Sequence, residues 1–148
     1  MRTRNYLDRP HPPTPADRIE RYIRAAVADM HVLTPFGLGS PDFIAPPDRP
    51  AWIEVHQREL FALTDEIGAC LRWFDRAGRT RNPSVSSYLI KHLIEHERGS
   101  HVHNGCAIVA AHARGFAIRL GWHSANPLIG VAARSIQPRP GDDYRLIC

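Results

Sequence analysis

The sequence changes its hydrophobic period once, at Gly115, and this change is the strongest constraint on its fold. Before Gly115, apolar residues recur every three or four positions, which is typical of amphipathic helices. After it, apolar side chains alternate with small or polar ones, which is typical of half-buried strands. We therefore expect an α+β chain that is mainly helical and carries its β-hairpin at the C-terminal end.

Helical periodicity predicts helices at about residues 14–30, 51–77, 84–98 and 104–114. The longest has an apolar stripe that runs from Ile53 through His56 to Phe74 and predicts one face packed against other helices. In the next helix, Val85, Leu89 and Leu93 are expected to be buried, and Ser87, Lys91 and Glu95 to face water. Strands are expected at residues 116–122 and 128–136.

The organisation predicted along the chain is that of one domain, since 148 residues fit a single hydrophobic core. Residues 1–13 are expected to be extended, 14–136 to form the helical domain, and 137–148 to form a tail. Within the domain, residues 34–50 are rich in proline and glycine and predict a long loop without regular structure.

Composition excludes several classes of protein. The chain has neither a long apolar span nor a signal-peptide core, which predicts a cytoplasmic protein. The cysteines Cys70, Cys106 and Cys148 are odd in number and far apart, which indicates reduced thiols. The net charge of +4 is modest and favours nucleic acid or an acidic protein surface as partner. All basic residues except Lys91 are arginine, which is also the expected result of a GC-rich genome.

The order of elements over residues 51–136 is that of a winged-helix unit, in which the helix before the hairpin enters the DNA major groove. The helix beginning near Asn104 would then read DNA, with arginines of the hairpin and of the preceding turn on the phosphates. Its middle is Ala, Ile, Val and Cys, so the alternative is a helix buried in the core. The predicted nucleic-acid-binding residues are Arg79, Arg81, His103, Asn104, His112, Arg114, Arg119, His123 and Arg134.

Histidines suggest a metal site as a further alternative. His92, Glu95 and His96 match the H-x-x-E-H pattern of inverted zinc peptidases, in which two histidines hold zinc and the glutamate activates water. Helical geometry places His96 on the apolar stripe and Glu95 on the wet face, which favours a core histidine over a zinc ligand. We therefore expect no catalysis, no metal and no cofactor. A structural zinc site with His96, His101, His103 and Cys106 as ligands is a further alternative.

Three segments of the second half resemble a set of small bacterial proteins carried on phages, plasmids and integrative elements. They share an S-Y-x-L-K-H segment, an N-G-x-x-I-x-A-A helix and a G-F strand start. The resemblance implies a regulator or an inhibitor of a host defence system, as anti-CRISPR proteins are. The residues of these three segments are Ser87-Tyr88-Leu89-Ile90-Lys91-His92, Asn104-Gly105-Cys106-Ala107-Ile108-Val109-Ala110-Ala111 and Gly115-Phe116, and Asn126-Pro127 adds a fourth, shorter match.

The function expected first is that of a non-catalytic, DNA-binding accessory or regulatory protein of a mobile genetic element. A protein that inhibits a host defence complex by binding it is the alternative, and a zinc-dependent hydrolase is the third reading. The expected partner is accordingly duplex DNA or a host protein complex, with homodimerisation left open.

Overall fold

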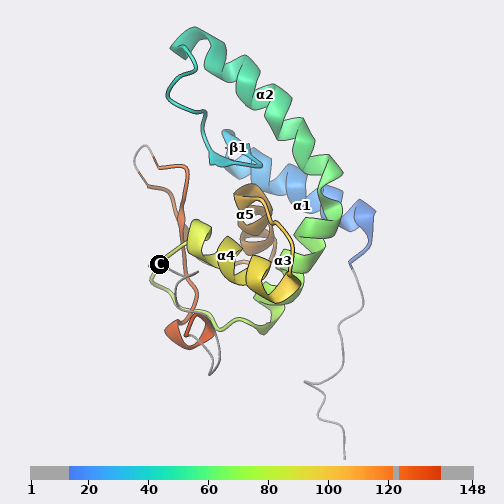
Figure 1. Cartoon of the computed structure of the whole chain (residues 1–148), viewed down its shortest axis with the longest axis vertical. Coiled ribbons are helices and arrows are strands. Elements are labelled where there is room, and N and C mark those ends of the chain that lie inside the picture. The colour runs from blue at the N-terminus through green and yellow to red at the C-terminus, as the bar shows by residue number, and fades with distance from the viewer. Residues whose placement is uncertain (1–13, 122–123, 138–148) are drawn as a thin grey trace, which may run out of the picture.

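A computed structural model describes residues 14–121 and 124–137 of the chain and confirms a mainly helical α+β fold. Three helices, α1 (Ala16–Asp29), α3 (Thr64–Arg76) and α4 (Ser87–Arg98), surround the central helix α5 (Asn104–Ala113) (Figure 1). Within the described residues, none of the helices combines the length and the apolar character that crossing a bilayer requires.

Helix α5 is the centre of the core. Every residue from Asn104 to Ala111 is buried, and the helix packs against α1, α3 and α4. Its many alanines allow the neighbouring helices to come close, and Gly115 ends it with a φ of +72°, in the left-handed region that glycine adopts readily. A helix enclosed in this way cannot enter a DNA groove, so the role of recognition helix predicted for it is wrong.

The single helix predicted at residues 51–77 is two helices in the structure. Helix α2 (Arg49–Glu59) ends in a 3-10 turn (Leu60–Ala62), and α3 begins at Thr64. The break turns Leu60 into the core, while α2 itself contains no buried residue and extends away from the helical body (Figure 1). The predicted burial of Ile53 and His56 is therefore wrong, because both are only half-buried on α2.

The proline- and glycine-rich stretch contains more structure than predicted. A two-stranded antiparallel hairpin, β1 (Leu33–Thr34) with β2 (Gly37–Leu38), packs against α2 and α5, and a 3-10 turn (Pro46–Asp48) leads into α2. Thr34 and Pro35, at the turn of the hairpin, are buried. Residues 34–50 thus begin as part of the packed body rather than as a loop.

Helix α4 is rotated relative to the prediction. Its buried residues are Ser87, Ile90, Lys91 and Ile94, whereas Leu89 and Leu93 are only half-buried. The Lys91 stem lies in the core while its ammonium group reaches polar partners, and this allows a charged residue on the inner face.

The predicted C-terminal hairpin is present but short. Strands β4 (Ile118–Arg119) and β5 (Leu128–Ile129) pair antiparallel with Ile118 opposite Ile129. A third strand, β3 (Val85–Ser86), completes a sheet of order β3-β5-β4, and a 3-10 turn (Ala133–Ser135) follows. Residues 122–123 of the predicted first strand and residues 138–148 of the predicted tail lie outside the described residues.

Candidate binding surface and polar network

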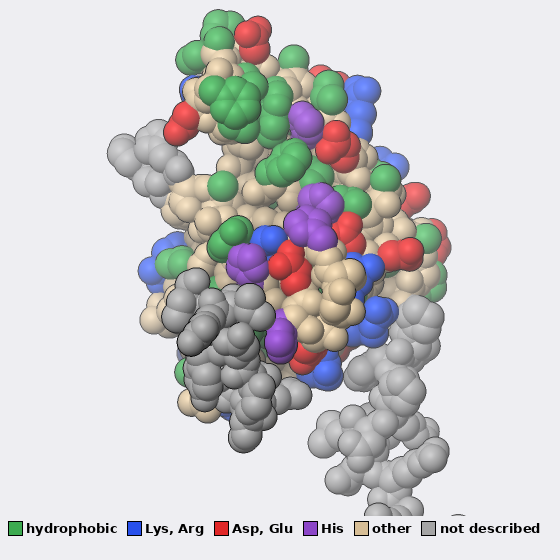
Figure 2. All heavy atoms as spheres, viewed as in Figure 1, with side chains coloured by type: hydrophobic (Ala, Val, Ile, Leu, Met, Phe, Trp, Pro, Cys, Tyr) green, Lys and Arg blue, Asp and Glu red, His purple; other side chains and the backbone are tan. Residues whose placement is uncertain are grey.

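One face of the protein gathers hydrophobic, histidine and carboxylate side chains (Figure 2). Its apolar part, which we call the aromatic surface, consists of Phe36 from the turn between β1 and β2 and of Trp52 and His56 from α2. The ring centroid of Phe36 lies 5.9 Å from that of Trp52 and 5.5 Å from that of His56. The Trp52 and His56 centroids are 4.1 Å apart. The three rings therefore form one continuous patch, of which Phe36 remains 54% exposed.

Further apolar groups are exposed on the same segment of chain. Val55 on α2 is 58% exposed, and Phe43, shortly before the helix, is 84% exposed. The carboxylates of residues 42–59 outnumber the arginines four to two, although the whole chain carries a charge of +4. This segment is therefore both apolar and locally acidic.

The hairpin that carries Phe36 is fixed to the first turn of α5 through backbone contacts. The Gly105 amide donates to the carbonyl oxygen of Pro35 at 2.9 Å. A Cβ atom on Gly105 would overlap the carbonyl oxygen of Thr34, so only glycine allows this approach. The Asn104 side-chain amide donates to Oδ1 of Asn126 at 2.8 Å, which joins the same turn to the segment before β5.

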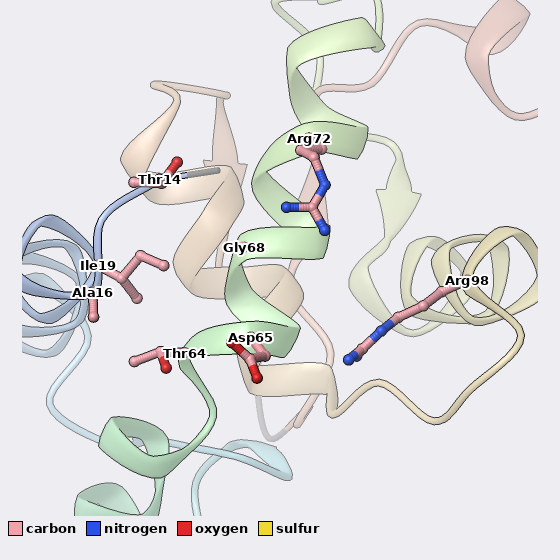
Figure 3. A pocket seen from close by; sticks show the side chains of 8 residues that line it. All are labelled: Thr14, Ala16, Ile19, Thr64, Asp65, Gly68, Arg72 and Arg98. Atoms are coloured by element: carbon pink, nitrogen blue, oxygen red, sulfur yellow. The ribbon is translucent and has the colours of Figure 1, made fainter. Parts of the chain in front are cut away.

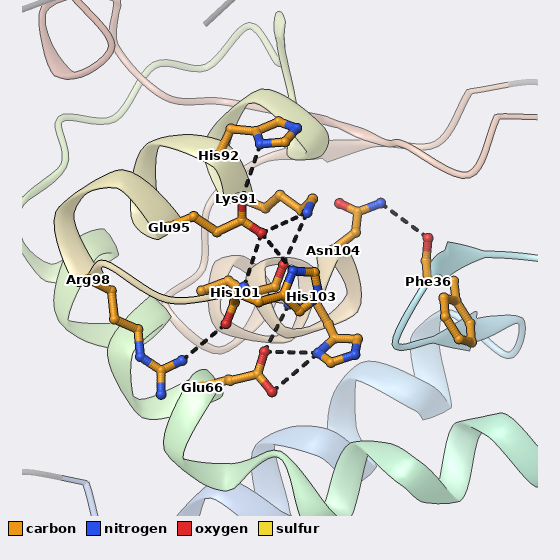
Figure 4. Close-up of polar contacts among 10 residues, drawn as sticks. Phe36, Glu66, Lys91, His92, Glu95, Arg98, His101, His103 and Asn104 are labelled. Carbon is orange, nitrogen blue, oxygen red and sulfur yellow. Dashed lines mark hydrogen bonds and ion pairs between the residues drawn. The ribbon is translucent and has the colours of Figure 1, made fainter. Parts of the chain in front are cut away.

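Glu66, in the first turn of α3, holds the N-terminal end of α5. Its Oε1 accepts hydrogen bonds from the His103 backbone amide and from His103 Nδ1, both at 2.9 Å (Figure 4). Because a carboxylate can only accept, Nδ1 carries the proton in this arrangement. The His103 ring lies 6.5 Å from that of Phe36, so the contact connects the polar network to the aromatic surface.

Glu95 organises the connection between α4 and α5. Its Oε1 accepts from Lys91 Nζ at 2.8 Å and from the Val102 amide at 3.0 Å, while Oε2 lies 3.1 Å from His92 Nδ1 (Figure 4). Lys91 Nζ also donates to the Val102 carbonyl at 3.3 Å, and His101 Nδ1 pairs with Glu95 at 3.1 Å. One carboxylate therefore satisfies most polar groups of this connection.

Burial alone would raise the pKa of the Glu95 carboxyl, because a low-polarity environment disfavours its charge. The hydrogen bonds from Lys91 and Val102 and the charges of Lys91 and His92 outweigh burial, and the net pKa lies below the ordinary value. Glu95 is consequently ionised at neutral pH, and its pairing with Lys91 is charge-assisted.

Two buried cysteines lie behind this network. Burial is the largest cause of a raised pKa in both Cys70 and Cys106, and the charge of Glu66 raises both further. Both thiols are therefore protonated and unreactive in this state. Glu66, His103 and Cys106 each offer one ligand atom, and these three atoms lie within 4.8 Å of one another. Among the described residues, these side chains therefore form a compact group of potential metal ligands.

The histidine pattern singled out in the sequence does not form such a group. His92 is engaged with Glu95, as described above, and His96 is exposed rather than in the core. Neither histidine belongs to the compact ligand group found among the described residues. The interpretation of His96 as a core histidine is thus wrong.

A pocket of about 400 Å³ lies between the start of α1 and α3 (Figure 3). Two guanidinium groups, those of Arg72 and Arg98, and the carboxylate of Asp65 supply its charges, and Ile19 contributes an apolar wall. We assign no ligand to this pocket.

The predicted nucleic-acid-binding residues divide into three groups. His103 and Asn104 belong to the polar network and hold the start of α5. At the other end of α5, His112 Nε2 lies within hydrogen-bond distance of Asp29 Oδ2, at 2.6 Å, and Arg114 forms an ion pair with Asp75 at 2.7 Å. The third group surrounds the three-stranded sheet and contains Arg79, Arg81, Arg119 and Arg134. His123 lies outside the described residues.

Sequence reasoning missed Glu66 and Phe36. Glu66 lies 37 positions before its partner His103, so no local spacing could connect them. Phe36 lies in the stretch predicted to be a loop, where its exposed ring gave no periodic signal.

Comparison with protein-family models, curated proteins and solved structures finds no match.

The Lys91–Glu95 pair is expected to stabilise the fold, because the two side chains are only 10% and 20% exposed. Lys91→Met keeps the apolar stem but leaves Glu95 without its main cation. We expect the free energy of unfolding at pH 7 to fall by roughly 1–3 kcal/mol. Arg58→Met is the matched control, since it removes an i,i+4 pair with Glu54 that is 74% and 68% exposed; its loss should stay within about 0.5 kcal/mol.

The same substitution should change the dependence of stability on pH. Because the folded-state pKa of Glu95 is lowered, its contribution is complete above the ordinary carboxyl pKa and is lost as the pH falls through the folded value. In Lys91→Met the folded-state pKa of Glu95 should rise toward or above the ordinary carboxyl value, so acidification should remove less stability than in the parent, as urea unfolding and NMR titration of Glu95 would show. An unchanged Glu95 titration in Lys91→Met would contradict the role given to the pair.

Proposed function

We propose that the protein is a non-catalytic binding protein that recognises a partner protein through the aromatic surface and the adjoining side of α2. The observation that carries this proposal is that α2 contains no buried residue although it contains Trp52, Ile53 and Val55. The helix packs mainly on the β1–β2 hairpin, which leaves Trp52 and Ile53 only half-buried and Val55 58% exposed. Exposed apolar patches of this kind commonly mark interaction sites.

The surface has the composition of an interface centre. Aromatic residues are enriched at such centres because they bury a large area at a low cost in conformational entropy. Phe36 already contacts Trp52 and His56, so its ring is held in place before binding. Complete burial of Phe36 and Val55, each more than half exposed, would contribute roughly 1 kcal/mol per side chain.

The charge around the surface indicates the chemistry of the partner. Asp42, Asp48, Glu54 and Glu59 lie in the same segment of chain as the apolar groups, against Arg49 and Arg58, and the Arg58–Glu54 pair still leaves a net negative charge. A partner with an apolar patch bordered by basic residues would match this arrangement. The phosphate backbone of DNA would not, because the local charge is negative. The resemblance to mobile-element proteins is compatible with an inhibitor that binds a basic host protein.

Binding should depend on the aromatic surface and not on apolar exposure elsewhere. A photoreactive amino acid placed at position 55 should crosslink a partner in host lysate, whereas one at position 120 should not. The partner so identified would then be purified, and its affinity measured by calorimetry. Phe36→Ser and Val55→Asp should each weaken binding at least tenfold, because they remove buried apolar area or bury a charge. The matched control is Leu120→Ser, because Leu120 directly follows β4 and is 55% exposed.

Equal crosslinking from positions 55 and 120, or full affinity in Phe36→Ser and Val55→Asp, would overturn this proposal. Circular dichroism and urea unfolding should first show that each variant is folded. Sedimentation analysis of the purified chain tests a second copy as the occupant; a dimer disrupted by Val55→Asp would also count against a heterologous partner.

Nucleic-acid binding is a second candidate, favoured by the arginines around the three-stranded sheet. The Thr80 amide donates to the Gly130 carbonyl at 2.9 Å, which places the turn that carries Arg79 and Arg81 beside β5 and its continuation. Arg79, Arg81, Arg119 and Arg134 are all exposed, and none of them forms an ion pair with a carboxylate of the described residues. Because α5 is enclosed, such binding would use phosphates and would not depend on base sequence.

Salt dependence tests this second candidate. Arg81→Ala combined with Arg134→Ala should reduce the slope of log affinity against log salt by about 2 for a random duplex, one unit for each lost phosphate contact. Arg18→Ala combined with Arg21→Ala removes two exposed arginines of α1 and should leave the slope unchanged. Absence of binding at low salt, or equal losses in both pairs of variants, would rule it out.

A further inference from the structure

Three potential metal ligands meet between the first turn of α3 and the first turn of α5. His103 and Cys106 have an H-x-x-C spacing, with His103 just before α5 and Cys106 in its first turn. Glu66 approaches from α3, and one ligand atom from each residue lies within 4.8 Å of the others. Around a tetrahedral ion with bonds of about 2.0–2.3 Å, ligand atoms are separated by roughly 3.3–3.8 Å. Small side-chain movements would therefore bring all three into a first coordination shell.

The types of ligand select the ion. Thiolate and imidazole are typical ligands of Zn²⁺, whereas Mg²⁺ and Ca²⁺ prefer oxygen ligands alone. A carboxylate completes three protein ligands and leaves one position for water or a further side chain. The side chains of Glu66 and His103 are 13% and 30% exposed and Cys106 is fully buried, so an ion would enter past His103.

We infer that Glu66, His103 and Cys106 form a zinc-binding site that joins α3 to α5. On binding, the Cys106 thiol loses its proton to solvent and the sulfur becomes a ligand. If Nδ1 of His103 is the second ligand, its proton moves to Nε2, so one proton is released for each zinc ion. The side-chain oxygen of Glu66 supplies the third ligand, in exchange for its hydrogen bond with the His103 ring.

The site has a structural consequence that hydrogen bonding alone does not provide. Without metal, Glu66 and His103 are connected only by hydrogen bonds at the start of α5. Bound zinc would connect both residues to Cys106 as well, through coordinate bonds that are stronger than these hydrogen bonds. Because the His103 ring lies 6.5 Å from the Phe36 ring, zinc bound to His103 would also restrict the movement of a residue that supports the aromatic surface. This inference does not depend on the proposed function, since the ligand group exists whatever binds the surface.

Cobalt provides the test, since a Co²⁺–thiolate bond gives a charge-transfer band in the near ultraviolet. Full-length protein with Cys148→Ser, purified without a histidine tag and stripped of metal, would be titrated with Co²⁺. A band that saturates at one equivalent and disappears on addition of Zn²⁺ is expected. Cys106→Ser should abolish it, whereas Cys70→Ser, which changes the other described buried thiol, should retain it.

A second measurement keeps the inference testable if Cys106→Ser fails to fold. Zn²⁺ should raise the melting temperature of the parent protein and bind Glu66→Gln at least tenfold more weakly. His112→Ala alters a histidine paired with Asp29 and should bind zinc like the parent. Absence of the cobalt band in the parent, its retention in Cys106→Ser, or equal zinc affinity of Glu66→Gln and the parent would overturn the inference.

Discussion

The close approach of the β1–β2 hairpin to the first turn of α5 is the contact on which the rest of the structure depends. Gly105 allows it, because a side chain there would occupy the space of the Thr34 carbonyl oxygen. Gly37 faces the carbonyl oxygen of Ala125 with a φ of +120° and permits the same closeness on the other side. The hairpin is thus held between α5 and the segment before β5, and it in turn supports α2.

In this arrangement, the candidate binding surfaces lie on the elements that enclose α5. With α5 enclosed, its terminal polar residues hold neighbouring elements: Glu66 binds His103 at one end, and Asp75 binds Arg114 at the other. The hairpin and α2 present apolar rings on one face, and the sheet presents arginines in another region. The aromatic surface is the stronger candidate, because its exposed rings are already ordered, whereas the arginines supply charge without a groove-reading helix.

Helical periodicity predicted α1 and the buried residues of α3 well, because both helices repeat apolar residues at the spacing of one buried face. Helix α5 has no single buried face, since every residue from Asn104 to Ala111 is buried. Periodicity failed at α2, where Ile53 and His56 continue the stripe although the chain turns at Leu60. It also predicted the wrong buried face for α4, because Lys91 counts as polar in the pattern although its stem is buried and its ammonium group pairs with Glu95. The site was even less accessible to prediction: Glu66 and His103 are brought together only by the packing of α3 on α5.

Two glycine-to-alanine substitutions in helices test the central contact most directly. Gly105→Ala should lower the free energy of unfolding by roughly 1–3 kcal/mol, because the new methyl group would displace the hairpin. Gly68→Ala, in the middle of α3, meets only ordinary contacts at 3.7 and 3.9 Å and should raise stability by up to about 1 kcal/mol. Urea unfolding of the two variants should therefore give shifts of opposite sign. A stabilised Gly105→Ala protein would show that the hairpin does not rest on α5, and the account of the surface it carries would fail.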